Sequence, residues 1–180
     1  MTSRIAVRQL VYIALMAVLI AACAWVTIPV GPVPFTLQTF GVFCALALLG
    51  GRDGTISVLV YLAIGALGVP VFSGFSGGIG KIVGPTGGYM LGFVAAGLIF
   101  WAGERLLGKT PAVRIASMIV GNLVCYAFGT AWFTVVAPSK PGLAAALSLC
   151  VLPYVIPDLC KIGLAYAAAK LLRNRVRLTK

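Results

Sequence analysis

Glycine is unusually dense between residues 74 and 92, where eight of nineteen residues are glycine. In the second half of this stretch, small residues recur at every fourth position: Gly84, Gly88, Gly92 and Ala96. This spacing puts them on one helix face, where the lack of bulky side chains lets a second helix approach closely. The first half is too rich in glycine for a stable helix and is expected to be loop. Irregular backbone at membrane depth persists only where protein covers it or where it lines a cavity, so the stretch is a candidate binding segment.

The composition indicates an integral membrane protein. Of the 180 residues, 61% are hydrophobic and 9% are charged, and the mean hydropathy is +1.09, which excludes an ordinary soluble domain. A membrane-spanning helix takes about 20 apolar residues. We therefore expect a single domain over residues 1–180, an all-α compact bundle of six transmembrane helices. The expected spans are roughly 5–28, 35–49, 55–69, 85–107, 112–136 and 156–172, with a partly inserted segment at 143–152.

Positive charge gathers on one side of the predicted bundle. Six spans put both termini on the same side, which then holds eleven of the fourteen Lys and Arg residues. The opposite loops hold Lys81 and Lys140, and Lys161 lies in a span. Because cytoplasmic loops are enriched in positive charge, both termini are expected to be cytoplasmic. Membrane orientation thus accounts for the net charge of +11, and no nucleic-acid partner is expected.

Asp158 and Lys161 are the charged residues that point most directly to function. They lie in the last predicted span, where charged side chains are costly and usually mark a substrate or ion path. Their i, i+3 spacing puts both on one helix face. One interpretation is a structural ion pair that fixes the helix. The other is a ligand site in which Lys161 binds a carboxylate and Asp158 accepts hydrogen bonds from ligand N–H groups.

Three further residues are candidates for lining a pocket. Gln38 is a polar residue at the start of the second predicted span, and Asn122 is the most polar residue inside the fifth. Tyr89 lies within the glycine-dense stretch, which makes it the aromatic residue most expected to contact a ligand.

The first predicted span carries a face of small residues, Ala14, Ala17 and Ala21. Small residues allow close helix contacts in lipid. This face therefore serves either internal packing or the docking of another membrane subunit, and the residues alone leave both interpretations open.

The sequence lacks the patterns of the enzymes that it superficially suggests. Gly80-Lys81 has neither the first glycine nor the hydroxyl residue of a phosphate-binding loop. The run 74–77 resembles the GxSG motif of rhomboid intramembrane proteases, but the chain has no histidine to act as the base. An aspartyl intramembrane protease needs two facing carboxylates, and only Asp158 is expected inside the membrane. The chain is therefore not expected to be an enzyme.

Several motifs resemble the BioY family, the biotin-specific S components of energy-coupling-factor (ECF) transporters. They extend over nearly the whole chain: Ile28-Pro29, Val33-Pro34-Phe35-Thr36-Leu37-Gln38-Thr39, Gly68-Val69-Pro70-Val71-Phe72, Gly84-Pro85-Thr86-Gly87-Gly88-Tyr89, Gly92-Phe93, and Pro153 with Asp158-Leu159-Cys160-Lys161. Pro157 is a departure, because the family usually has glycine at this position.

The resemblance implies a biotin transporter subunit of the bacterial cytoplasmic membrane, which captures biotin near the outer face. It adds Thr86 and Gly87 to the candidate substrate-binding residues. The implied partners are biotin, membrane lipid, a transmembrane T component and two ATPase subunits, with no cofactor. Docking to the T component is expected through the face of Ala14, Ala17 and Ala21. The alternative is a self-sufficient secondary transporter of biotin or a similar small carboxylate, in which Asp158 carries a coupling proton.

Overall fold

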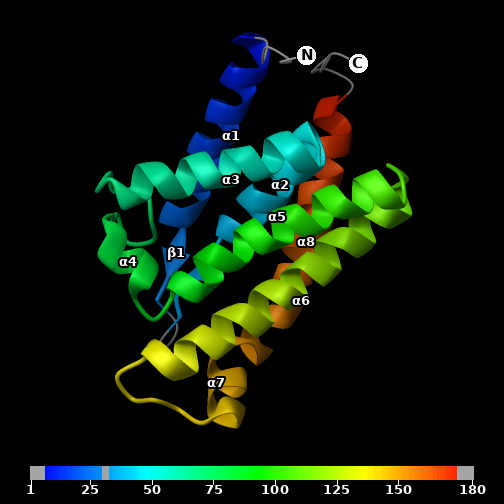
Figure 1. Cartoon of the computed structure of the whole chain (residues 1–180). Coiled ribbons are helices and arrows are strands. Elements are labelled where there is room, and N and C mark those ends of the chain that lie inside the picture. Colours follow the sequence, from blue (N-terminus) through cyan, green and yellow to red (C-terminus); the bar gives the residue numbers. More distant parts are fainter. Residues whose placement is uncertain (1–6, 30–32, 174–180) are drawn as a thin grey trace.

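The computed structural model describes residues 7–29 and 33–173, and helices dominate it (Figure 1). A short antiparallel ribbon joins the first two helices, with Thr27 opposite Thr36 and Ile28 opposite Phe35. The described elements are α1 (Val7–Trp25), β1 (Thr27–Ile28), β2 (Phe35–Thr36), α2 (Gln38–Leu49), α3 (Gly51–Ala66), α4 (Ile79–Val83), α5 (Gly87–Leu106), α6 (Pro111–Val136), α7 (Leu143–Cys150) and α8 (Leu152–Arg173). The expected helical class is confirmed.

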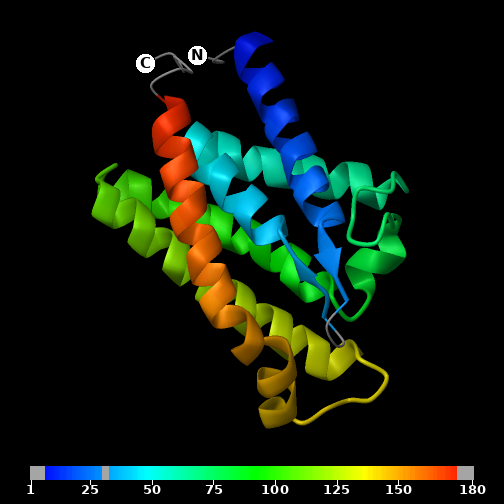
Figure 2. The same cartoon turned by 180° about the vertical axis from the view of Figure 1, so that it is seen from behind.

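α2 is the central helix of the bundle. Ten of its twelve residues are buried, and it packs against α1, α3 and α8. Figure 2 shows it between α1 and α8. Buried apolar side chains from α1, α2, α3, α5, α6 and α8 form one hydrophobic cluster around it. The apolar composition of α2 therefore reflects burial inside the protein.

Three described helices, α1, α5 and α6, are long and apolar enough to cross a membrane. The pair of α7 and α8, bent by 43°, adds a fourth candidate if it forms one span. α2 has 12 residues and α3 has 16, fewer than the roughly 20 that cross the hydrocarbon core without tilt or thinning. Length and composition therefore identify three or four candidate spans among the described helices. They leave the expectation of six spans untested.

The small-residue faces of α5 and α6 pack against each other, as the four-residue spacing predicts. A Cβ added at Gly92 would lie 2.8 Å from the Sγ atom of Cys125, and one at Gly121 would lie 3.1 Å from the Cα atom of Ala96. Helices this close have no room for side chains at the crossing. The expected close approach of a second helix to this face is confirmed, and that helix is α6.

Several boundaries differ from the sequence-based expectation. Residues 79–83 were expected to be loop but form α4, because the chain turns at Gly78 (φ 94°) and the run that follows contains a single glycine. Gly84 ends α4 and lies before α5, so it does not belong to the helical small-residue face. Phe35, expected in the second span, pairs with Ile28 in the ribbon, and α2 begins at Gln38.

α8 begins at Leu152 rather than Ile156 and continues through Pro157. The segment 143–152, expected to be partly inserted, forms α7 and the bend into α8. Asp158 and Lys161 therefore lie in the second and third turns of α8. The first turn of α1 and the last turn of α8 lie at the same end of the molecule, and α7 lies at the other (Figure 1).

Candidate functional site

A pocket with an empty volume of about 640 Å³ lies between the segment 33–39 and α5, α6 and α8. Its wall combines polar with apolar and aromatic side chains, among them Pro34, Thr36, Gln38, Met90, Phe93, Asn122, Tyr126, Tyr154, Asp158 and Lys161. This mixture suits a small ligand that has both an apolar body and polar ends.

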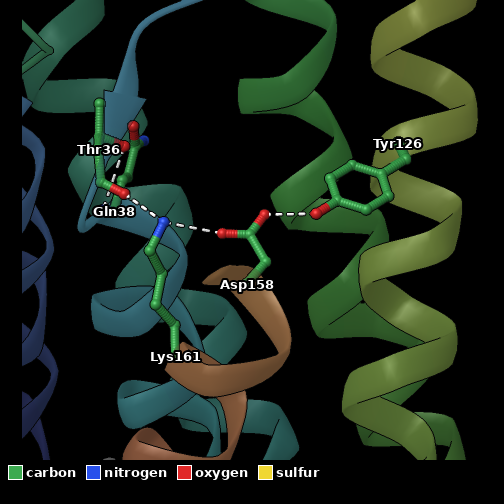
Figure 3. Close-up of polar contacts among 5 residues, drawn as sticks. All are labelled: Thr36, Gln38, Tyr126, Asp158 and Lys161. Atoms are coloured by element: carbon green, nitrogen blue, oxygen red, sulfur yellow. Dashed lines mark hydrogen bonds and ion pairs between the residues drawn. The ribbon is translucent and has the colours of Figure 1, made fainter. Parts of the chain in front are cut away.

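Asp158 and Lys161 form a buried ion pair in the wall of the pocket (Figure 3). The Nζ atom of Lys161 donates to Oδ1 of Asp158 at 2.8 Å and to the backbone oxygen of Thr36 at 2.7 Å. The hydroxyl of Tyr126 donates to the other carboxylate oxygen, Oδ2, at 2.6 Å. The two charged residues are only 4% and 6% exposed. Both charges therefore have partners, which a buried pair needs to be stable.

The β-ribbon positions backbone and aromatic groups over Lys161. The ring of Phe35 lies with its centroid 3.8 Å from Nζ, a cation–π contact. Tyr154 stacks on Phe35 with 6.0 Å between the ring centroids, and its hydroxyl donates to the backbone oxygen of Val33. The segment that follows the first helix is thus held against α8 by three different contacts, which fixes one wall of the pocket.

Two hydrogen bonds outside the ion pair fix further polar groups of the wall. The amide nitrogen of Gln38 donates to the hydroxyl of Tyr61 at 3.1 Å. The hydroxyls of Tyr89 and Thr130 lie 3.0 Å apart. A carboxylate, an ammonium group, amides and hydroxyls therefore converge on a space that is otherwise apolar. Such a set can bind a ligand that has both N–H donors and an anionic group.

The structure brings together six of the seven predicted substrate-binding residues. These six line one pocket: Gln38, Thr86, Tyr89, Asn122, Asp158 and Lys161. Gly87 is the exception, because it is buried at the start of α5, where an added Cβ would lie 1.7 Å from the backbone oxygen of Ile82. Its role is close packing of α5 against α4.

The alanine face of α1 is split by the structure. Ala17 and Ala21 are 3% and 5% exposed and belong to the hydrophobic core, whereas Ala14 is exposed. The reason is that α1 packs closely on α2, where a Cβ added at Gly41 would lie 3.1 Å from the Cα atom of Ile20. The expected docking face is therefore corrected: Ala17 and Ala21 serve internal packing, and their side chains are not accessible to a partner in this conformation.

Sequence reasoning missed two tyrosines of the pocket, Tyr126 and Tyr154. Each lies about one helical turn from a residue that the sequence analysis had already selected. Tyr126 lies four residues after Asn122 on α6, and Tyr154 lies four residues before Asp158 on α8. Extending each candidate by one helical turn would have found both.

Comparisons with known proteins agree on one family. The family model described as "BioY family" matches residues 1–178. The chain is 40% identical over 167 residues to the probable biotin transporter BioY of Pyrococcus horikoshii, covering 93% of this chain and 97% of that protein. It is 38% identical over 170 residues to the biotin transporter BioY of Thermotoga maritima, covering 93% and 96%.

A solved structure supports the same relationship. The fold matches a crystal structure of the S-component for biotin from an ECF-type ABC transporter with a TM-score of 0.83 and 28% sequence identity. The match covers 97% of this chain and 95% of that one. The motifs, the fold and the relatives thus converge, and this multi-pass membrane protein belongs to the BioY family.

Proposed function

We propose that this chain is the biotin-binding S component of an ECF transporter and that biotin occupies the pocket around Asp158 and Lys161. The observation that carries the proposal is the buried pair itself, held at 2.8 Å in the wall of a pocket that polar and apolar side chains line together. Family membership supports the choice of ligand. In this proposal the chain binds and releases biotin without changing it chemically, as expected for a transport subunit.

The chemistry of biotin matches the groups around the pocket. Biotin has a carboxylate, two ureido N–H groups and an apolar fused ring. A carboxylate side chain has about four acceptor positions, and Asp158 uses two of them for Lys161 and Tyr126. Asp158 therefore has capacity to accept ureido N–H groups, and Lys161 to donate to the ligand carboxylate. Met90 and Phe93 offer apolar surface to the ring.

The energy for uptake is proposed to come from partners. The sequence contains no phosphate-binding loop motif, so a T component and two ATPase subunits would supply ATP hydrolysis. We further propose six membrane crossings within one domain, both termini in the cytoplasm and residence in the cytoplasmic membrane. This orientation is supported by the distribution of Lys and Arg.

Membrane vesicles test this proposal against proton-coupled uptake by the chain alone. The chain is expressed with and without an ECF module, and labelled biotin uptake is measured with ATP inside the vesicles or with an imposed proton gradient. We expect uptake that requires both the module and ATP. Uptake by the isolated chain that follows the proton gradient and disappears with a protonophore would instead establish the secondary transporter.

The face of α1 that remains accessible is the proposed contact with the T component. Its residues at intervals of four are Ala14, Val18 and Ala22, all exposed, and small residues favour close helix contact in lipid. Replacing Ala14 or Ala22 with Trp should leave biotin binding by the purified chain unchanged. Co-purification with the T component should fall about tenfold, as expected when a bulky side chain disrupts packing by ~1–3 kcal/mol.

Ala17→Trp on the same helix is the matched control. Because Ala17 lies in the core, this variant should lower the folded yield and remove biotin binding and partner binding together. Unchanged co-purification for both exposed variants would place the T component elsewhere on the protein.

A further inference from the structure

A second cavity adjoins the ligand pocket and contains one charged side chain. Its wall is formed by α4 and the segments on either side of it. Four residues, Pro34, Ser73, Thr86 and Met90, line both this cavity and the ligand pocket, so the two spaces are neighbours. We call this outer space the vestibule. Its charged residue is Lys81, which α4 carries (Figure 1).

The side chain of Lys81 has no role in holding the fold. It is exposed, and within residues 7–29 and 33–173 it makes no hydrogen bond or ion pair. The exposed, unpaired ammonium group of Lys81 therefore lies in the cavity that adjoins the ligand pocket.

The electrostatics around the vestibule favour an anion. The chain has three acidic residues, Asp53, Glu104 and Asp158. Asp53 and Glu104 line a different cavity, together with Gln9 near the start of α1. Asp158 is neutralised by Lys161 at 2.8 Å. A carboxylate approaching the vestibule thus meets the positive field of Lys81 with no uncompensated negative charge in either wall.

We infer that the vestibule is an encounter site for anionic ligands, in which Lys81 attracts the ligand carboxylate before the ligand enters the pocket. This inference rests on the proposed function for the identity of the ligand. Clefts with low-dielectric walls focus the field of a charge and raise the rate of association of an oppositely charged ligand. Because Lys81 acts on the approach and Lys161 lies in the pocket, Lys81 sets the association rate and not the lifetime of the complex.

Stopped-flow kinetics of biotin binding to the purified full chain test this inference. At about 0.01 M ionic strength, Lys81→Gln should lower the association rate constant about two- to threefold and Lys81→Glu about five- to tenfold, as a single charge at encounter distance predicts. The dissociation rate constant should not change. Raising the ionic strength to about 1 M should remove the difference. Lys81→Arg should keep the wild-type rate.

Two controls separate steering from other effects. Lys140→Gln removes an exposed cation that lines neither cavity, and it should leave association unchanged. Biotinamide, which lacks the negative charge, should associate equally fast with wild type and with Lys81→Glu. The inference is overturned if association of biotin is the same in all variants, if biotinamide is slowed as much as biotin, or if only dissociation changes. Failure of the wild-type chain to bind biotin would instead overturn the proposed function.

Discussion

Replacing Lys161 with Ala is expected to weaken biotin binding roughly 10- to 150-fold, which corresponds to the ~1.5–3 kcal/mol of a hydrogen bond to a charged group. Lys161 is the cation of the pocket wall, paired with Asp158 and covered by Phe35. Its removal also leaves a buried carboxylate with Tyr126 as its hydrogen-bond partner. Breaking a buried pair costs roughly 3–5 kcal/mol, so folded stability should fall as well. Titration calorimetry and thermal unfolding measure the two effects separately.

A double variant distinguishes a binding role from a purely structural one. Asp158→Leu with Lys161→Met removes both charges and keeps apolar volume, a change that is often neutral or stabilising for a buried pair. We expect this protein to fold and to lose biotin binding. If it folds and still binds biotin with wild-type affinity, the pair is only structural.

Two milder probes assign the individual contacts. Tyr126→Phe removes the hydroxyl that donates to Asp158 and should lower the free energy of unfolding by about 1.5 kcal/mol, the lower end of the range for a hydrogen bond to a charged group. With Lys161→Ala, binding of biotinamide should be weakened less than binding of biotin. Equal weakening of both would mean that Lys161 does not hold the ligand carboxylate.

Gly92→Leu is expected to be strongly damaging although Gly92 does not line the pocket. An added Cβ at Gly92 would already lie 2.8 Å from Sγ and 3.0 Å from Cα of Cys125, so a full leucine must separate α5 from α6. Overpacking commonly costs ~1–3 kcal/mol and sometimes more, and here the clash includes backbone. We expect a large loss of monodisperse protein in detergent, measured by fluorescence-detected size exclusion.

Substitutions at Gly88 test the same helix packing, because the structure predicts that even alanine is too large at this position. A Cβ at Gly88 would lie 2.3 Å from the Cβ of Trp132, so Gly88→Ala should also lower the yield, although less than Gly88→Leu. Gly163 on α8 is the matched control, since nothing lies within 4 Å of an added Cβ. Gly163→Leu should leave the yield unchanged or improve it through helix propensity. Equal yields at Gly92 and Gly163 would contradict close packing of α5 and α6.

Local patterns predicted which residues gather around the pocket, because each pattern depends on short-range geometry. The i, i+3 spacing places Asp158 and Lys161 on one helix face, and the two form a direct ion pair. The four-residue spacing of small residues predicted the contact of α5 with α6. The family resemblance added Thr86, which lines the same pocket.

The failures have a common physical origin in tertiary contacts. A periodic face such as that of Ala14, Ala17 and Ala21 does not reveal which side the protein covers, and Ala17 and Ala21 lie in the hydrophobic core. Hydropathy does not separate a helix buried in protein from one that faces lipid, so it did not reveal that α2 is the buried central helix of the bundle. Tyr126 was missed because its importance lies in a bond to Asp158, 32 residues away in the sequence.

Binding of biotin by the isolated chain tests the central claim most directly. The chain is expressed without partners in biotin-depleted cells, purified, and titrated with biotin by calorimetry. We expect saturable binding of one biotin per chain, weakened by Lys161→Ala and absent in the Asp158→Leu/Lys161→Met variant. A folded, monodisperse wild-type chain that binds no biotin would contradict the account.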